Sequence, residues 1–224
     1  DIVLTGKYGS DIPAVDEDLL AKEGYVFGGW EPALPETYPT EDAEYTAIWN
    51  PATDTPYQVW VYLENTDGTY PADDDPSEVI NMTGETDAVI NVAVPTPYGF
   101  VLNETKGDVK NEVTIAPDGS TVYKVYYDRV KYAITFDGNG GTIAGEPSTT
   151  GEYRYLASVT APADADLYKE GHTFAGWAPA VDSVATKDVK YVAQWEVNSY
   201  DVNYMIKAED IKDATEDELF KTES

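Results

Sequence analysis

The sequence predicts an α+β chain that is dominated by strands and divided into small tandem modules. Three observations lead to this prediction: a segment that recurs along the chain, short runs of alternating apolar residues, and very few helix signals. With 224 residues, the chain is long enough for two to four small domains.

The recurring segment is recognised by its conserved spacing of aromatic and glycine residues within this chain. Residues 22–33 read KEGYVFGGWEPA, and residues 169–180 read KEGHTFAGWAPA. Each copy is followed by a Tyr-x-Ala-x-Trp strand, at Tyr45–Trp49 and Tyr191–Trp195, so four of the five tryptophans occupy equivalent positions. Self-similarity at this level indicates a repeated structural module.

The repeat and the proline-rich linkers divide the chain into four segments. Residues 1–50 form a truncated copy, 54–131 an unlike β-rich module, 132–196 a complete copy, and 197–224 a tail or the start of a further module. Linkers this short favour a semi-rigid rod. The first copy lacks the opening strand of the second. Either the sequence is an excerpt from a longer array, or a neighbouring chain adds the strand by β-augmentation.

Within the complete copy, residues 132–136 alternate as a strand, and the run DGNGG at 137–141 predicts a hairpin turn. This run is not a phosphate loop, because no helix signal or lysine follows the glycines. Short helices are expected at 16–22 and 163–169, each with a glycine beyond its end, and a capping box at 215–218 is a third candidate.

In the middle module, strands are expected at 57–63 and 121–127, with further strands around 90–94 and 113–115. Gly68 and Gly119 supply the turns. In the first of these strands Tyr57, Val59, Val61 and Leu63 share one face, which leaves Trp60 and Tyr62 on the other.

Composition excludes several classes of function. The formal net charge of −28 disfavours binding to nucleic acids and to anionic membranes. Without cysteine, and with His172 as the only histidine, the chain has no disulfides, no Cys/His zinc site and no catalytic triad that omits His172. No apolar run approaches the roughly 20 residues of a membrane span. The aromatic content of 12% argues against disorder.

A family resemblance follows from these motifs. The segments Tyr132-x-Ile-x-Phe136, Gly138–Gly141, Gly171-x-x-Phe174-x-Gly-Trp177 and Tyr191-x-Ala-x-Trp195 resemble the internalin B-repeat family, also called the Listeria–Bacteroides repeat. The resemblance covers residues 132–196 and, as a truncated copy, about 5–50. It implies small β-grasp modules in an elongated array. The middle module is similar to mucin-binding-type repeats, through Tyr57–Tyr62 and Val122–Tyr127. The family name "mucin-binding" does not imply that this module binds mucin, because a shared fold does not establish a shared function.

Aromatic residues are the main candidates for function. The expected structural core comprises Phe27, Trp30, Trp49, Phe174, Trp177 and Trp195. The alternative is a ligand platform in which Trp30 and Trp177 stack on sugar rings. If the modules themselves bind a partner, the candidate contact surface is Trp60, Tyr62 and Tyr126, because such rings supply binding energy where they are exposed. For Trp60, which lies opposite the core face of its strand, packing at a module junction is the favoured interpretation and an exposed patch is the alternative.

Two polar sites are interpreted as structural or surface features rather than as functional sites. The cluster Asp73, Asp74 and Asp75 offers the oxygen ligands that calcium prefers, but no EF-hand spacing is present, and a solvated loop is the favoured interpretation. His172 stands where the first copy has Tyr25, which indicates a packing or surface role. No nucleophile or oriented partner for a catalytic base is evident.

We therefore expect a non-catalytic extracellular segment, acting as a stalk or spacer of a bacterial surface protein or adhesin. No cofactor is expected, and no metal beyond the weak calcium candidate. In the alternative, the modules themselves bind a host glycoprotein, a glycan or a neighbouring copy of the protein.

Overall fold

The computed structural model describes residues 2–16 and 19–204. These residues form strands, turns and irregular segments, and the bounded helical element among them is the short 3₁₀ helix η2 (Asp164–Asp166). The chain separates into two compact units, Asp1–Val130 (unit 1) and Lys131–Ser224 (unit 2). The prediction of a strand-dominated chain is confirmed.

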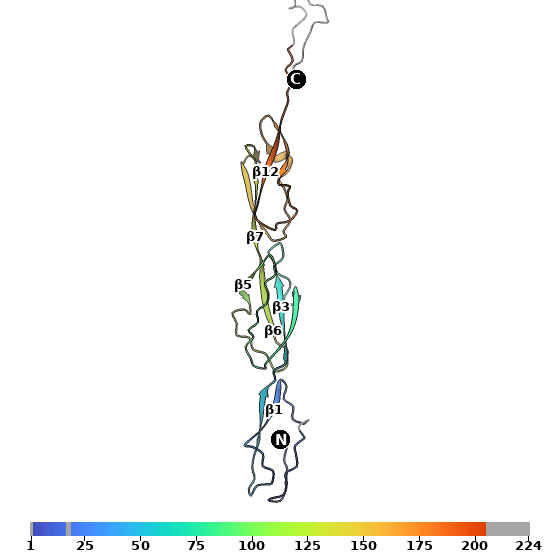
Figure 1. The fold of residues 1–224 in the computed structure, drawn as a ribbon, viewed down its shortest axis with the longest axis vertical. Helices are drawn as coiled ribbons and strands as arrows, with labels where there is room; N and C mark the ends of the chain where they lie inside the picture. The colour runs from blue at the N-terminus through green and yellow to red at the C-terminus, as the bar shows by residue number, and fades with distance from the viewer. Residues whose placement is uncertain (1, 17–18, 205–224) are drawn as a thin grey trace, which may run out of the picture. The chain divides into compact units, whose positions relative to one another are not determined.

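Unit 1 contains a four-stranded sheet (Figure 1). Its strands are β3 (Thr55–Leu63), β4 (Glu78–Gly84), β5 (Phe100–Gly107) and β6 (Val122–Arg129), in the order β4-β3-β6-β5. The central pair β3–β6 is parallel, and each outer strand pairs antiparallel with its neighbour.

One face of this sheet carries the core of unit 1. Tyr57, Val59 and Val61 of β3 are buried there, as the alternation of β3 predicted, and Leu63 packs against them. Strand β6 contributes further buried residues to the same cluster: Tyr123, Val125 and Tyr127.

Unit 1 also holds a two-stranded antiparallel sheet, made of β1 (Tyr25–Glu31) and β2 (Thr46–Pro51). A bulge between Phe27 and Gly29 lets Gly29 adopt a positive φ of 115°. A bulge of this kind redirects the side chains that follow it.

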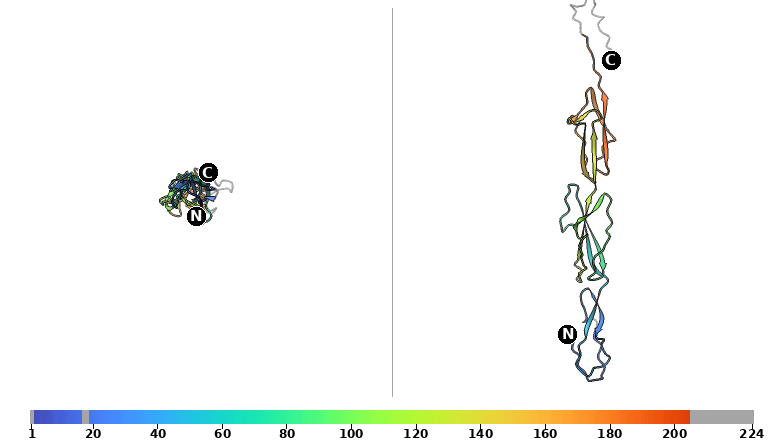
Figure 2. Two further views of the ribbon diagram at one scale, coloured as in Figure 1. Left: turned by 90° about the horizontal axis from the view of Figure 1, so that it is seen from below. Right: turned by 90° about the vertical axis from the view of Figure 1, so that its left-hand side faces the viewer.

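Unit 2 has a sheet with the same pattern of pairing. Its order is β11-β12-β7-β9, formed by β7 (Lys131–Asp137), β9 (Ser148–Arg154), β11 (His172–Ala178) and β12 (Val189–Val197). Strands β7 and β12 lie side by side and are parallel (Figures 1 and 2). If the four strands of each sheet are numbered 1 to 4 along the chain, their order across both sheets is 2-1-4-3.

A small ladder and a compact core complete unit 2. Strand β8 (Thr142–Ile143) pairs with β10 (Leu167–Tyr168). The core cluster includes Ile134 and Phe136 of β7, Ile143 of β8 and the fully buried Tyr191 of β12.

The repeated sequence folds into the same local structure twice. Hairpin β11–β12 has the bulge of β1–β2, between Phe174 and Gly176, and Gly176 has a φ of 119°. Strands β1 and β11 share one burial pattern, residue for residue. In the described residues β12 has the parallel neighbour β7, whereas β2 pairs with β1 alone.

The predicted helices are wrong where the structure describes them. At 163–169 the chain forms the short 3₁₀ helix η2 and then β10, because so short a segment nucleates an α-helix poorly and its end pairs with β8 instead. At 16–22 the described residues contain a single 3₁₀ residue and no α-helix, and residues 17–18 lie outside the description. The candidate at 215–218 also lies outside the described residues.

The expected strands at 90–94 and 113–115 are also wrong. The two segments touch through the single bridge Val89–Thr114, although Ile90 and Ile115 are buried as their alternation suggested. The sheet instead uses β4 and β5 as its outer strands.

Candidate functional site

The second face of the middle sheet carries a tyrosine cluster rather than an open contact surface. Tyr62 and Tyr126 stack with ring centroids 4.5 Å apart, and the ring of Tyr70 meets Tyr126 edge-on at 5.0 Å. Tyr62 is 0% exposed and Tyr126 4% exposed. The expected exposure of these two rings is therefore wrong.

The loop between β3 and β4 explains this burial. The Tyr62 hydroxyl donates a hydrogen bond to the backbone oxygen of Asp73 at 2.6 Å, and the Tyr126 hydroxyl lies 3.5 Å from the Asp73 carboxylate. Covering by a loop from outside the strand is a tertiary effect, which strand alternation does not report.

Burial and neighbouring carboxylates act on the ionisation of this cluster. Burial, reinforced by Asp73, raises the pKa of Tyr126 to about 12. Burial also raises the pKa of Tyr70, whose hydroxyl donates a hydrogen bond to Asp128. Lys106 lies over the cluster, with its Nζ 4.5 Å from the ring centroid of Tyr70 and 4.9 Å from that of Tyr126. The arrangement keeps the tyrosines protonated and fixes the loop.

Trp60 differs from the two buried tyrosines. It is half-buried, its Nε1 donates to Gln58 Oε1 at 2.9 Å, and Lys124 Nζ lies 5.7 Å from its ring centroid. Of the three predicted contact residues, Trp60 is the one with accessible ring surface.

The acidic cluster Asp73–Asp75 lies on the exposed part of the same loop. Asp73 accepts the tyrosine hydrogen bonds described above, so it anchors the loop to the sheet. Over the described part of the chain, no three acidic, histidine or cysteine side chains are grouped to hold a metal ion.

The six predicted core aromatics form two matching trios. Phe27 packs edge-on against Trp30 and Trp49, with centroids 5.4 and 5.9 Å apart. The trio of Phe174, Trp177 and Trp195 has the corresponding distances of 5.3 and 5.7 Å. All six rings are half-buried.

The glycine-rich run at 137–141 is a turn closed against the second trio. Trp195 Nε1 donates to the backbone oxygen of Gly138 at 2.8 Å, and an added Cβ on Gly141 would lie 2.5 Å from the Trp195 ring. The close approach of an indole ring accounts for glycine there. Strand β8 follows directly but pairs with β10, and β7 pairs with β9, so the run is a turn but does not by itself connect the predicted two-stranded hairpin.

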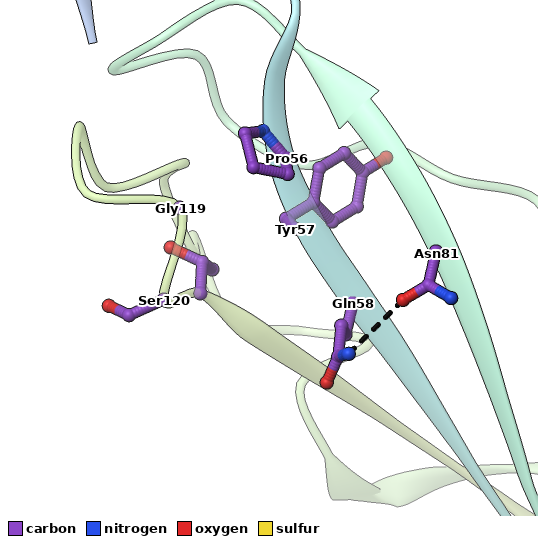
Figure 3. Close-up of a pocket in the computed structure, with 7 residues that line it drawn as sticks. Pro56, Tyr57, Gln58, Asn81, Gly119 and Ser120 are labelled. Atoms are coloured by element: carbon purple, nitrogen blue, oxygen red, sulfur yellow. Dashed lines mark hydrogen bonds between the residues drawn. The ribbon is translucent and has the colours of Figure 1, made fainter. Parts of the chain in front are cut away.

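Two small pockets, one in each unit, are formed by described residues. The first, of about 290 Å³, lies between the start of β3, β4 and the 119–121 turn (Figure 3). There Gln58 Nε2 donates to Asn81 Oδ1 at 3.1 Å. The second, of about 330 Å³, is lined by Phe174 and Trp195 together with Lys169 and His172. Amide groups and aromatic rings of this kind suit weak binding of polar ligands.

His172 opens strand β11 at the rim of the second pocket. Its Nδ1 lies 2.7 Å from the backbone oxygen of Glu170, and a carbonyl only accepts, so Nδ1 carries the proton.

Unit 1 contains a hydrogen-bonded junction that the sequence reasoning missed. The turn after β4 docks against the hairpin β1–β2: the Thr86 hydroxyl donates to the Gly24 oxygen at 2.6 Å, and the Thr86 backbone N–H to the Ala52 oxygen at 2.9 Å. The Tyr25 hydroxyl donates to Asp87 Oδ2 at 2.6 Å, and this bond raises the pKa of Tyr25. Thr86 is 1% exposed, so its side chain is shielded from water, whereas the Tyr25–Asp87 hydrogen bond lies at the exposed edge of the junction.

No described helix is long or apolar enough to cross a lipid bilayer.

Comparison with known proteins finds a family model that matches one segment of the chain. Residues 132–203 match the model of the Listeria-Bacteroides repeat domain. Over 226 residues the chain is 24% identical to a protein of Evansella cellulosilytica named "Putative Gly-rich membrane protein", covering 88% of this chain and 24% of that protein. It is 25% identical to a second protein of that organism, named "Putative membrane protein", covering 88% of this chain and 32% of that protein. The chain therefore spans about a quarter to a third of the length of the curated relatives it matches, and its similarity to the repeat family is limited to residues 132–203.

Proposed function

We propose that this chain is a non-catalytic, extracellular repeat segment that acts as a stalk or spacer in a bacterial surface protein or adhesin. One observation carries the proposal: the same aromatic hairpin occurs twice, in β1–β2 and β11–β12, with an unlike module of its own core between the copies. Modules stabilised by their own cores and by their neighbours suit a spacer. Relatives that are much longer and named as membrane proteins support a surface location.

We further infer that both four-stranded sheets are β-grasp-like modules, that the first aromatic hairpin is a second copy of the matched repeat, and that the middle module is of the mucin-binding type. The support for the β-grasp assignment is topological, since each sheet joins two antiparallel pairs through a parallel contact of their inner strands. The support for the second copy is the shared bulge, burial pattern and aromatic geometry. The high negative charge keeps neighbouring copies on one cell apart.

Small-angle X-ray scattering of the chain, with and without calcium, tests the spacer. The expected result is an elongated monomer with the same maximum dimension in both conditions. A compact particle, or one that changes its dimension with calcium, contradicts the proposal. The variant Asp74→Asn is the control for a calcium effect, because Asp74 lies in the exposed acidic loop and Asn removes its charge.

A second candidate function is direct binding of a glycan or host glycoprotein. It is favoured by the accessible ring of Trp60 beside Lys124 and by the pocket lined by Phe174 and Trp195. Sugars stack on aromatic faces, and neutral amide groups near such rings fix their orientation. A glycan array probed with the chain and with Trp60→Ala separates the two functions. Binding that is lost in the variant favours this candidate, whereas no binding at high protein concentration favours the spacer.

A further inference from the structure

The junction of unit 1 has a counterpart in unit 2, and none of the described residues is docked on it in the way that Thr86 is docked on Gly24. Gly24 and Tyr25 correspond in the repeat to Gly171 and His172. The residue after each hairpin is also equivalent, since the N–H of Ala52 donates to the Gly24 oxygen at 2.9 Å and the N–H of Asn198 to the Gly171 oxygen at 2.9 Å.

The two surfaces differ in what lies against them. A Cβ added to Gly24 would meet the backbone of Pro117 at 2.5 Å, because the middle module is packed there. A Cβ added to Gly171 would meet nothing within 4 Å among the described atoms. Both glycines have positive φ, 75° and 66°, so the backbone presents the same carbonyl in both places.

The polar groups are also matched. In unit 1 the Tyr25 hydroxyl donates to the Asp87 carboxylate, and Thr86 donates to the carbonyls of Gly24 and Ala52. In unit 2 the carbonyls of Gly171 and Asn198 are equivalent acceptors. His172 replaces Tyr25, and with Nδ1–H donated to Glu170 its Nε2 donates only when the ring is protonated. A carboxylate there forms a charge-assisted hydrogen bond with the imidazolium.

We propose that Gly171, His172 and Asn198 form a docking site for a Thr-Asp turn of the Thr86–Asp87 kind, carried by a module built like residues 55–129. The proposal rests on the tandem-array function and adds to it the surface through which one module holds the next. The occupant is specified by the unit 1 junction, where such a turn fills the same surface. The curated relatives are three to four times longer than the matched stretch, which leaves room for further modules of this kind.

A fusion protein tests the docking site. Residues 1–198 are followed by a second copy of residues 53–130, so that Asn198 takes the place that Ala52 has in the connection of unit 1. His172 is the single histidine of the chain, so its imidazole signals are unique in an NMR titration. Docking is expected to raise the pKa of His172 by about one unit over its value in the 224-residue chain, because the appended Asp87 favours the charged ring.

Two variants of the appended copy make the result specific. Asp87→Ala is expected to abolish the rise in the pKa of His172, and the exposed Asp74→Ala to leave it intact. An unchanged pKa in the fusion overturns the proposal, as does a rise that survives Asp87→Ala. An appended copy that does not fold also overturns it, because the same residues fold beside Gly24. The spacer proposal is tested separately. If the particle is elongated and the pKa of His172 is unchanged in the fusion, the spacer proposal stands and the docking site is rejected.

Discussion

Thr86 shows how one hydroxyl joins two sheets of unit 1. Its Oγ1 lies 2.6 Å from both the Gly24 oxygen and Thr55 Oγ1, and the residue is 1% exposed. A buried acceptor that loses its donor keeps its desolvation penalty. Nothing local to Thr86 in the sequence signals this role, because both partners are distant along the chain.

Thr86→Val is expected to destabilise unit 1 by about 1–3 kcal/mol, because it removes the hydroxyl that bonds the Gly24 oxygen and leaves the buried Thr55 hydroxyl without that partner, while conserving side-chain volume. Chemical denaturation followed by tryptophan fluorescence measures the loss. Thr149→Val, on the exposed strand β9, is the matched control and should change stability by less than about 0.5 kcal/mol. Equal effects of the two substitutions would show that the junction contributes nothing.

The tyrosine cluster predicts a loss of stability in alkali. Tyr126 has a folded-state pKa of about 12 against 10.0 for an ordinary tyrosine. The unfolded chain therefore loses this proton first, so the stabilisation is complete below pH 10 and is lost as the pH rises to 12. Denaturation midpoints across this interval, with tyrosinate absorbance read in parallel, measure the effect. Tyr126→Phe should show a shallower fall, and an identical fall would contradict this origin.

At the scale of elements, the strands that could be predicted from the sequence are those in which a clear alternation of apolar residues coincides with pairing to neighbouring strands. Strand β3 and its core face followed from Tyr57, Val59 and Val61, and β6 and β7 were found in the same way. Strands β4 and β5 were missed because they are outer strands with many exposed polar residues, which weakens the apolar period. At 90–94 the alternation of apolar residues correctly predicted that Ile90 is buried. Burial alone does not form a strand, because a strand also needs a neighbouring segment to pair with.

The candidate site was predictable to a similar degree. Repeated sequence identified both aromatic trios, because local spacing fixes which rings share a hairpin. The cover over Tyr62 and Tyr126, and the docking of Thr86 on Gly24, depend on contacts between distant segments. Such contacts leave no period in the sequence, so they required the structure.

The two bulges give a prediction that compares the repeats directly. Gly29→Ala and Gly176→Ala are each expected to cost about 1–2 kcal/mol, since both positions have a φ near 115–119° and open space around an added Cβ. Only backbone strain therefore acts at either site. Ala175→Gly, at the neighbouring exposed position, controls for a general effect on the strand. Measured by denaturation, a marked cost in one copy alone would contradict the equivalence of the hairpins.

At the scale of the whole molecule, electrostatic repulsion is the dominant feature. The 42 acidic residues face 14 basic ones, and ion pairs such as Lys131–Glu152 at 2.8 Å lie on the surface. Exposed pairs of this kind contribute little. The net charge of −28 therefore destabilises the compact state by self-repulsion, while it also keeps copies of the chain apart.

Added salt should raise the melting temperature, in contrast to proteins held together by surface ion pairs. Going from about 0.01 M to about 1 M NaCl shortens the Debye length from about 30 Å to about 3 Å, which screens the repulsion. Differential scanning calorimetry measures the shift. The double variant Asp42→Asn, Glu44→Gln removes two exposed charges from one acidic run, so it should melt higher than the natural chain at low salt and equally at high salt. A melting temperature that falls with salt, or a variant whose advantage persists in 1 M NaCl, would mean that specific ion pairs outweigh the net charge.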